Sequence, residues 1–215
     1  DGESKVNYWP QYAEEFYRPV EKEELPDLPL EDNRFQVIFT GNIGYAQGLD
    51  ILPKAAHILK DRGRECCFIL VGDGRYREKL EEEIRTEQVE DMFRLLGRKP
   101  AEDVPKYLAH GDAAFISFAD NELFQMTIPA KLQSYLACGM PILAAAGGET
   151  ARIMQEAGCG ICSKLGEPQA LADAIVRFME LPVEDRNKMR TAAENYSARQ
   201  FAKKTLMDRM DEEFK

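Results

Sequence analysis

The sequence predicts an α/β fold in which a doubly wound parallel sheet of about six strands is followed by C-terminal helices. From Phe35 onward, apolar runs of strand length alternate with amphipathic stretches of helix length. The apolar runs lack polar alternation, which is typical of strands that helices cover on both faces. Because the runs form two successive groups of three, we expect the strand order to reverse near the middle of the sheet.

Glycines punctuate the first half of this pattern. The apolar run at 35–40 ends in a glycine turn at Gly41. The next stretch places its apolar residues three or four apart, as one helix face requires, before Gly63 ends it. The second run is closed by Gly72-Asp73-Gly74. The predicted elements are strands at Phe35–Thr40, Cys66–Val71 and Met92–Leu96, with helices at Leu49–Asp61 and Tyr76–Glu87.

The second half repeats the alternation. Gly139 ends a helical stretch and Gly147 ends an apolar run, so the boundaries again follow turn residues. The predicted strands are Ala113–Phe118, Pro141–Ala146 and Gly160–Lys164, and the predicted helices are Glu102–Ala109, Ile128–Ala137, Glu149–Glu156, Pro168–Glu180, Val183–Tyr196 and Ala198–Phe214.

The first 34 residues have a different composition from the rest, rich in Glu and Pro, with the only tryptophan of the chain in an aromatic cluster that extends from Tyr8 to Tyr17. This predicts a tail or interdomain segment at 1–34, before a domain at 35–215. The cluster either packs on that domain or marks a surface that an absent partner domain would cover.

Length and charge exclude several classes. A chain of 215 residues predicts one large domain or one domain with an appendage. The net charge of −10, without a basic block, argues against a nucleic-acid partner. No apolar run is long enough to span a bilayer, and no signal peptide is recognised. Cys138, Cys159 and Cys162 have apolar or glycine-flanked settings that suit small buried residues in a reducing compartment, so a cytoplasmic location is expected.

No metal or nucleophile motif is complete. Cys159-x-x-Cys162 has no second pair, so no metal site is expected. His57 lies in the middle of a predicted helix and His110 at a helix end, positions that favour structural roles over general-base catalysis. Ser117 lacks the G-x-S-x-G context of a hydrolase nucleophile.

The loops after the strands are the expected ligand site, because ligands of such sheets lie beyond the carboxyl ends of the strands. The first loop, Gly41–Gly48, fits neither the G-x-G-x-x-G pattern nor a Walker A motif. Its glycines would still let a phosphate approach the backbone N–H groups that begin the next helix. A turn that simply needs glycine geometry is the alternative.

The loop at 119–129 is long for a strand-to-helix connection, which favours a functional role. Thr127 is predicted to cap the following helix, with Pro129 just inside it. Lys131 then falls in the first helical turn, where a cation gains nothing from the helix dipole. It is either a solvated surface lysine or a charge directed at a bound anion.

Together these residues resemble a known family. The segments 41–48, 70–74 and 96–98, and above all 128–143 (Ile128-Pro129-Ala130-Lys131 through Ala137-Cys138-Gly139-Met140-Pro141-Ile142-Leu143), are similar to the C-terminal, donor-nucleotide domain of family four (group 1) glycosyltransferases. The resemblance covers about 35–215 and implies half of a GT-B fold, a Rossmann-like domain. Tyr8-Trp9-Pro10 resembles the connection between the two domains of full enzymes, and bacterial surface-polysaccharide transferases are the most similar members.

The resemblance implies a nucleotide-diphosphate sugar as donor, most of all a UDP-sugar, without a cofactor. The base would lie near residues 97–99 and the diphosphate between the first loop and the helix that follows residue 127. Lys131 is the candidate catalytic residue, since a cation there would stabilise the departing diphosphate. The candidate donor-binding residues are Gly41, Asn42, Ile43, Gly44, Gln47, Gly72, Gly97, Arg98, Lys99, Glu122, Phe124, Gln125, Met126, Thr127, Ile128 and Ser134.

The sequence departs from the family at four positions. An Arg and a Lys that grip the diphosphate in most members correspond to Asn42 and Gln47. Two glutamates that contact the donor sugar and the ribose in many members correspond to Met126 and Ser134. The positive charge for the diphosphate must therefore come from Lys131 or from cations of a domain absent from this chain.

The expected function is that of the donor half of a retaining glycosyltransferase. The N-terminal acceptor domain is missing, and through it the full protein would reach a polysaccharide or lipid-linked acceptor, which places it peripherally at the inner membrane face. By itself the chain is expected to be inactive. Two alternatives remain: an enzyme similar to sugar-nucleotide epimerases, and a non-catalytic Rossmann-like adaptor module.

Overall fold

A computed structural model of the 215-residue chain describes residues 10–30, 32–119, 121 and 127–213. Its centre is a six-stranded sheet with the order β3-β2-β1-β4-β5-β6. All five neighbouring pairs are parallel. The predicted strands are confirmed as β1 Phe35–Thr40, β2 Cys66–Val71, β3 Phe93–Gly97, β4 Ala113–Ser117, β5 Ile142–Ala145 and β6 Gly160–Ser163.

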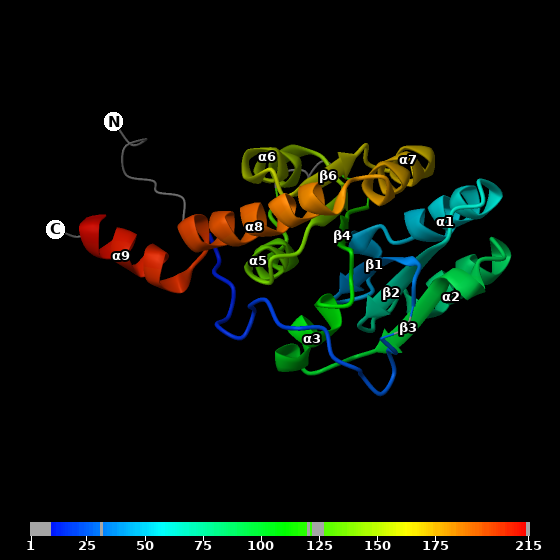
Figure 1. Cartoon of the computed structure of the whole chain (residues 1–215), viewed down its shortest axis with the longest axis horizontal. Coiled ribbons are helices and arrows are strands. Elements are labelled where there is room, and N and C mark those ends of the chain that lie inside the picture. The colour runs from blue at the N-terminus through cyan, green and yellow to red at the C-terminus, as the bar shows by residue number, and fades with distance from the viewer. Residues whose placement is uncertain (1–9, 31, 120, 122–126, 214–215) are drawn as a thin grey trace.

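Helices lie on both sides of the sheet (Figure 1). Within the described residues, the α-helices are α1 Ile51–Asp61, α2 Arg77–Thr86, α3 Val104–Leu108, α5 Ala130–Ala137, α6 Gly148–Ala157, α7 Pro168–Met179, α8 Val183–Gln200 and α9 Lys203–Glu213. Short 3-10 helices lie at η2 Tyr45–Gln47, η3 Glu90–Met92 and η4 Ala101–Asp103.

Two hydrophobic layers follow from the alternation of side chains along each strand. In β1, Val37 and Phe39 join the layer formed with α1, α2 and α7, whereas Ile38 faces α3, α5, α6 and α8. Both layers are apolar, which explains why the strand runs carry no polar alternation. The doubly wound prediction is therefore confirmed.

The centre of the sheet is the point where the strand order reverses. β1 lies between β2 and β4, with Thr40 opposite Val71 on one side and Ile38 opposite Ala114 on the other. The connections after β1 and β4 leave in opposite directions, so a crevice opens between their carboxyl ends.

The C-terminal helices differ from the prediction. The expected break near residue 197 is wrong, because α8 continues through the buried Tyr196 and Ser197 to Gln200. The chain turns instead at Phe201, whose buried ring packs 5.7 Å from that of Tyr196. Tertiary contacts that bury one face of the helix therefore keep it helical beyond the break that the local sequence predicts.

One cysteine prediction is also wrong. Cys162 is exposed, whereas Cys138 and Cys159 are buried as expected. Cys162 lies on β6, an edge strand of the sheet, and its thiol donates a hydrogen bond to the carbonyl of Ala146 at 3.0 Å.

Residues 10–30 and 32–34, called here the N-terminal segment, pack against the sheet domain. Leu28 is only 1% exposed and lies in the same hydrophobic layer as α5 and α8. His110 contacts the carbonyl of Glu23 through Nε2 at 2.8 Å. Toward its beginning, the ring of Tyr12 lies 5.4 Å from the ammonium group of Lys203 on α9.

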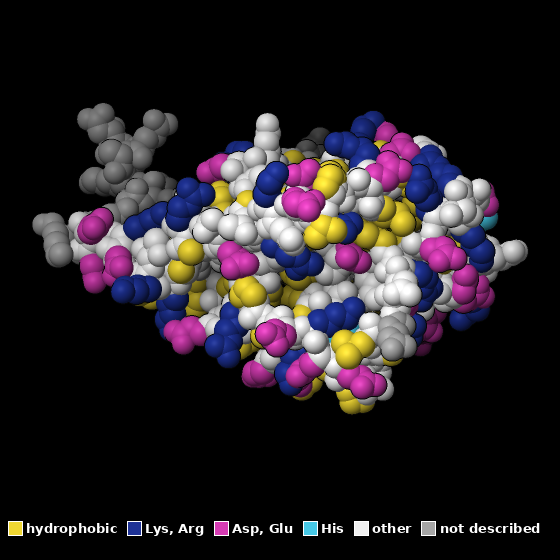
Figure 2. Space-filling model, in the orientation of Figure 1, with side chains coloured by type: hydrophobic (Ala, Val, Ile, Leu, Met, Phe, Trp, Pro, Cys, Tyr) yellow, Lys and Arg dark blue, Asp and Glu magenta, His cyan; other side chains and the backbone are white. Residues whose placement is uncertain are grey.

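The surface in Figure 2 carries acidic and basic side chains intermingled over the visible face, without one continuous basic patch. None of the helices in the described part of the chain combines the length and the apolar composition that crossing a membrane requires.

Candidate functional site

A cavity of about 880 Å³ lies at the carboxyl ends of the central strands, where the topology predicts a ligand site. The loops after β1, β2 and β3 form one wall, the start of α5 forms another, and the N-terminal segment closes one side. It is lined by Tyr17, Thr40, Gly41, Asn42, Ala46, Gln47, Val71, Gly72, Asp73, Gly74, Arg98, Lys99, Ala101, Val104, Phe118, Thr127, Pro129, Ala130, Lys131 and Ser134.

The floor of the cavity is backbone. The Gly41 N–H donates to the carbonyl of Val71 at 2.9 Å, and the Gly72 N–H donates to that of Gly97 at 2.8 Å, so the three loops are bonded edge to edge. A Cβ atom on Gly72 would lie 1.8 Å from the carbonyl oxygen of Gly41, a distance that no side chain can occupy. Glycine is therefore required for this close approach, and it leaves the floor open to a ligand.

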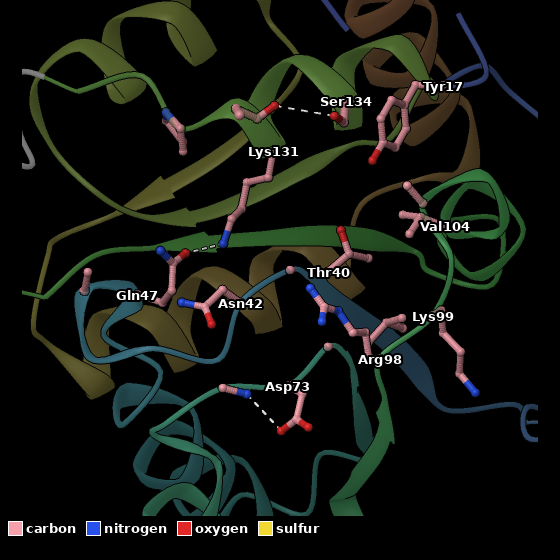
Figure 3. Close-up of a pocket in the computed structure, with 18 of the residues that line it drawn as sticks. Tyr17, Thr40, Asn42, Gln47, Asp73, Arg98, Lys99, Val104, Lys131 and Ser134 are labelled. Atoms are coloured by element: carbon pink, nitrogen blue, oxygen red, sulfur yellow. Dashed lines mark hydrogen bonds between the residues drawn. The ribbon is translucent and has the colours of Figure 1, made fainter. Parts of the chain in front are cut away.

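Lys131 extends from α5 over this floor (Figure 3). Its ammonium group lies 3.9 Å from the centre of the Phe39 ring and donates a hydrogen bond to the side-chain oxygen of Gln47. The same group lies 3.9 Å from the position that a Cβ on Gly41 would take. The interpretation of Lys131 as a solvated surface lysine is therefore wrong.

A buried hydrogen bond fixes the helix that carries this lysine. Tyr135 follows one turn after Lys131, is fully buried, and accepts a hydrogen bond from the N–H of Thr40 at 2.8 Å. Because Thr40 is the last residue of β1, this contact connects α5 directly to the strand end where Gly41 begins the first loop.

Burial lowers the pKa of Lys131 to about 7, since desolvation disfavours the charged form. No carboxylate in the described part of the chain forms an ion pair with this lysine; its recorded partners are an aromatic ring and an amide oxygen. A cation desolvated without a counter-charge gains stability when an anion enters.

The opposite side of the cavity contains Arg98 and Lys99, which behave differently. In Figure 3 the Arg98 side chain lies toward the cavity and the Lys99 side chain points away from it. The Lys99 ammonium group pairs with the carboxylate of Asp27, which also accepts a hydrogen bond from the Tyr107 hydroxyl at 3.0 Å. Burial opposes ionisation of Asp27, but these two hydrogen bonds lower its pKa overall. The charge of Lys99 is thus already balanced within the protein.

The structure assembles most of the described candidate residues around this cavity. Gly41, Asn42, Gln47, Gly72, Arg98, Lys99, Thr127, Lys131 and Ser134 line it. Ile43, Gly44, Gly97 and Ile128 belong to the same loops or to the segment before α5, but they are not among its lining residues. Glu122, Phe124, Gln125 and Met126 lie outside the described residues.

The predicted start of the helix before Lys131 is wrong. The helix begins at Ala130, with Pro129 as an extended N-cap residue (φ −72°, ψ 136°), so Thr127 is not its cap. The physical reason is the proline: its ring disfavours helical geometry at the preceding Ile128, so the helix cannot begin there.

Sequence reasoning missed several lining residues. Thr40 and Asp73 lie next to the glycines of the first two loops. Their positions beside those turns could have predicted that they line the cavity. Val104 begins α3, and nothing in the sequence around it predicts that it lines the cavity. Tyr17 belongs to the aromatic cluster, but only tertiary packing brings it to the cavity.

The histidines lie away from this cavity, as their positions in the sequence predict. His57 is exposed on α1, and its Nδ1 contacts the carbonyl of Glu87 at 2.9 Å. His110 is 3% exposed, and burial lowers its pKa. Among the described residues, no three His, Cys, Asp or Glu side chains are grouped as a metal ion would require.

Comparison with known proteins identifies relatives. The family described as "Glycosyl transferases group 1" matches residues 20–196. The chain is 28% identical over 183 residues to "Probable glycosyltransferase WbjE" of Pseudomonas aeruginosa, an alignment that covers 82% of this chain and 44% of the relative. It is 23% identical over 177 residues to "Amylovoran biosynthesis glycosyltransferase AmsK" of Erwinia amylovora, covering 75% and 43%. The chain thus spans less than half the length of these relatives.

Solved structures share the fold. HepE from Anabaena, crystallised with UDP, superposes with a TM-score of 0.72 at 22% identity, over 85% of this chain and 49% of that one. The C-terminal domain of a group 1 family protein (LpcC) from Francisella tularensis superposes with a TM-score of 0.66 at 12% identity, over 87% of this chain and 97% of that one. The second match shows this fold as a crystallised domain in its own right.

Proposed function

Because this chain belongs to the group 1 glycosyl transferases, we propose that it is the donor-binding half of a retaining glycosyltransferase that uses a nucleotide-diphosphate sugar. The observation that supports this most is Lys131, a cation above a glycine floor, without a carboxylate partner among the described residues. That arrangement suits the diphosphate of a nucleotide sugar.

The proposed chemistry needs charge stabilisation more than acid–base groups. When the bond from the anomeric carbon to the diphosphate breaks, negative charge accumulates on the departing phosphate oxygen. Lys131 would meet that charge with its ammonium group, and Asn42 and Gln47 would offer amide N–H donors where most of the family has cations. The reaction as we propose it uses no cofactor and no metal ion.

We propose UDP as the nucleotide to test first, because HepE has been crystallised with UDP and with UDP-glucose. The names of curated relatives, such as amylovoran biosynthesis, support a polysaccharide or lipid-linked acceptor. Since the chain spans less than half of these relatives, we place acceptor binding in an N-terminal domain, which would also reach any membrane-associated acceptor.

Thermal unfolding with UDP, GDP, ADP and dTDP tests the proposal. A nucleotide at 100 times its Kd adds about 2.7 kcal/mol of stability. For a chain of this size, that amount raises the melting temperature by about 5–10 °C. We expect at least UDP to give such a shift, and Lys131→Met to reduce it strongly at the same concentration.

Lys54→Met is the matched control. Lys54 lies on α1, outside the cavity, and pairs with Asp50 at 3.5 Å, so its replacement removes the same charge from the surface. It should leave the nucleotide shift unchanged. Absence of a shift with all four nucleotides would overturn the proposal and favour an adaptor module.

A further inference from the structure

We propose that the Tyr17 hydroxyl binds a ribose hydroxyl of the donor nucleotide beside Ser134, the position where the family resemblance already implies a ribose contact, so that a residue of the N-terminal segment determines selectivity for a ribonucleotide. This inference rests on the proposed function, because it assigns the ribose to one part of the same cavity. It adds a residue that lies outside the range 20–196 matched by the family.

The position of Tyr17 is the first observation. It is half-buried, packs against the layer that contains α5 and α8, and lines the cavity. Figure 3 shows its hydroxyl pointing into the cavity from the side where Ser134 lies. Both side chains line this cavity, and burial raises the pKa of the Tyr17 hydroxyl while the Ser134 side chain partly opposes that rise.

Spacing along α5 supports a ribose at this place. Ser134 follows Lys131 by three residues, which puts the two on the same helix face, about 4.5 Å apart along the axis. In a nucleoside diphosphate the ribose follows directly after the phosphates. With the diphosphate on Lys131, one helical turn therefore brings Ser134 and Tyr17 to the sugar, and leaves the region of Arg98 and Val104 for the base.

The chemistry of the two side chains suits a vicinal diol. A serine hydroxyl and a tyrosine hydroxyl can each donate one hydrogen bond and accept others, as the 2′- and 3′-hydroxyls of ribose require. Ser134 occupies the position where the resemblance implies a ribose-binding glutamate, so its short side chain leaves room beside it. The Tyr17 hydroxyl faces the space beside the Ser134 side chain.

The N-terminal segment, which carries Tyr17, packs on the sheet domain, so the position of the Tyr17 hydroxyl is fixed by the fold. Leu28 is buried in the core, and Leu25 and Leu28 pair their backbones at 3.1 and 3.3 Å. Asp27 pairs with Lys99, a lining residue of the same cavity. The wall formed by the segment is therefore part of the folded domain.

Calorimetric titration of the full 215-residue chain with UDP, 2′-deoxy-UDP and 3′-deoxy-UDP tests this assignment. Tyr17→Phe keeps the ring and removes only the hydroxyl. We expect it to weaken UDP binding by about two- to tenfold, the effect of one neutral hydrogen bond. At the same time, discrimination against one of the two deoxy ligands should disappear, because that ligand already lacks the partner of the Tyr17 hydroxyl.

Tyr12→Phe is the matched control, since Tyr12 lies in the same segment but contacts Lys203 on α9 instead of the cavity. A general loosening of the segment would weaken all three ligands equally, and the selectivity ratio separates that case from a ribose contact. If Tyr17→Phe binds all three ligands as the wild type does, or weakens all three equally, the assignment is overturned while the proposed function stands. A wild-type chain that binds no nucleotide overturns the proposed function itself.

Discussion

The ammonium group of Lys131 is the residue-scale feature that distinguishes this site. Its neighbours are the ring of Phe39 and the amide of Gln47, neither of which carries charge. The other charged side chains that line the cavity are Asp73, Arg98 and Lys99, and the last of these is paired with Asp27. An anion that enters the cavity therefore meets a lysine whose charge is not yet compensated.

The pKa of Lys131 near 7 predicts a pH-dependent affinity. An anion favours the protonated lysine, so binding requires proton uptake above pH 7, and UDP affinity should fall by about tenfold or more between pH 7 and pH 9. Lys131→Arg remains charged throughout this range and should flatten the dependence relative to wild type. Titration calorimetry in buffers of different ionisation enthalpy would measure the proton uptake directly; equal pH profiles for the two proteins would contradict the prediction.

The lowered pKa of Lys131 also makes the free energy of unfolding depend on pH. The direction is opposite to that for an ion-paired lysine, whose pKa is raised by folding. The folded state holds a lowered pKa, so the unfolded chain binds more protons between about pH 7 and pH 10.5. The contribution of Lys131 to the free energy of unfolding therefore increases with pH through that window.

At the scale of elements, α5 and β1 act as one unit. The hydrogen bond from the Thr40 N–H to the Tyr135 hydroxyl joins them inside the core, and one turn earlier the same helix carries Lys131 above the glycine floor. The helix therefore has its position set by a buried polar contact as well as by apolar packing.

Tyr135→Phe tests this unit. The variant leaves a buried backbone N–H without its recorded partner, so we expect the free energy of unfolding in urea to fall by about 1–3 kcal/mol. The matched control is Tyr196→Phe, whose hydroxyl contacts Glu156 at 3.3 Å in a partly buried setting, and which should cost less. Equal losses in the two variants would show that the Thr40 contact has no special role.

The sequence predicts the elements well for a physical reason. Strands buried on both faces appear as apolar runs, and the turns that need special backbone geometry appear as glycines, so all six strands and the glycine loops are expected correctly. Boundaries set by non-local packing are missed, as the continuation of α8 through Tyr196 shows. The place of Tyr17 in the cavity is missed for the same reason, since it brings Tyr17 beside residues such as Ser134 that are more than one hundred positions away in the chain.

At the scale of the whole molecule, the described residues form a sheet domain with a cavity of about 880 Å³ at the carboxyl ends of its central strands, and the chain spans less than half of its curated relatives. Transfer requires an acceptor held against the anomeric carbon, and much of the rate comes from that placement. On the proposed function, this half would hold the donor and stabilise the leaving group.

We accordingly expect the 215-residue chain to bind a nucleotide sugar without transferring the sugar. Release of UDP from UDP-sugars, followed with a coupled assay, should stay at least about a thousandfold below a typical kcat of about 10 s⁻¹. The thermal shift of the same preparation is the control that the donor site is intact. Turnover close to that of ordinary enzymes would contradict the proposed division of labour.

The backbone floor of the cavity also decides how this protein could be re-engineered. Because a Cβ atom on Gly72 would collide with the backbone of Gly41, any side chain at that position would force the two loops to shift. The rim is different: Tyr17, Arg98 and Ser134 reach the cavity through side chains from three separate segments. A library restricted to these rim positions would vary the side chains that face a ligand while leaving the glycine floor unchanged, so ligand preference and backbone geometry can be altered separately.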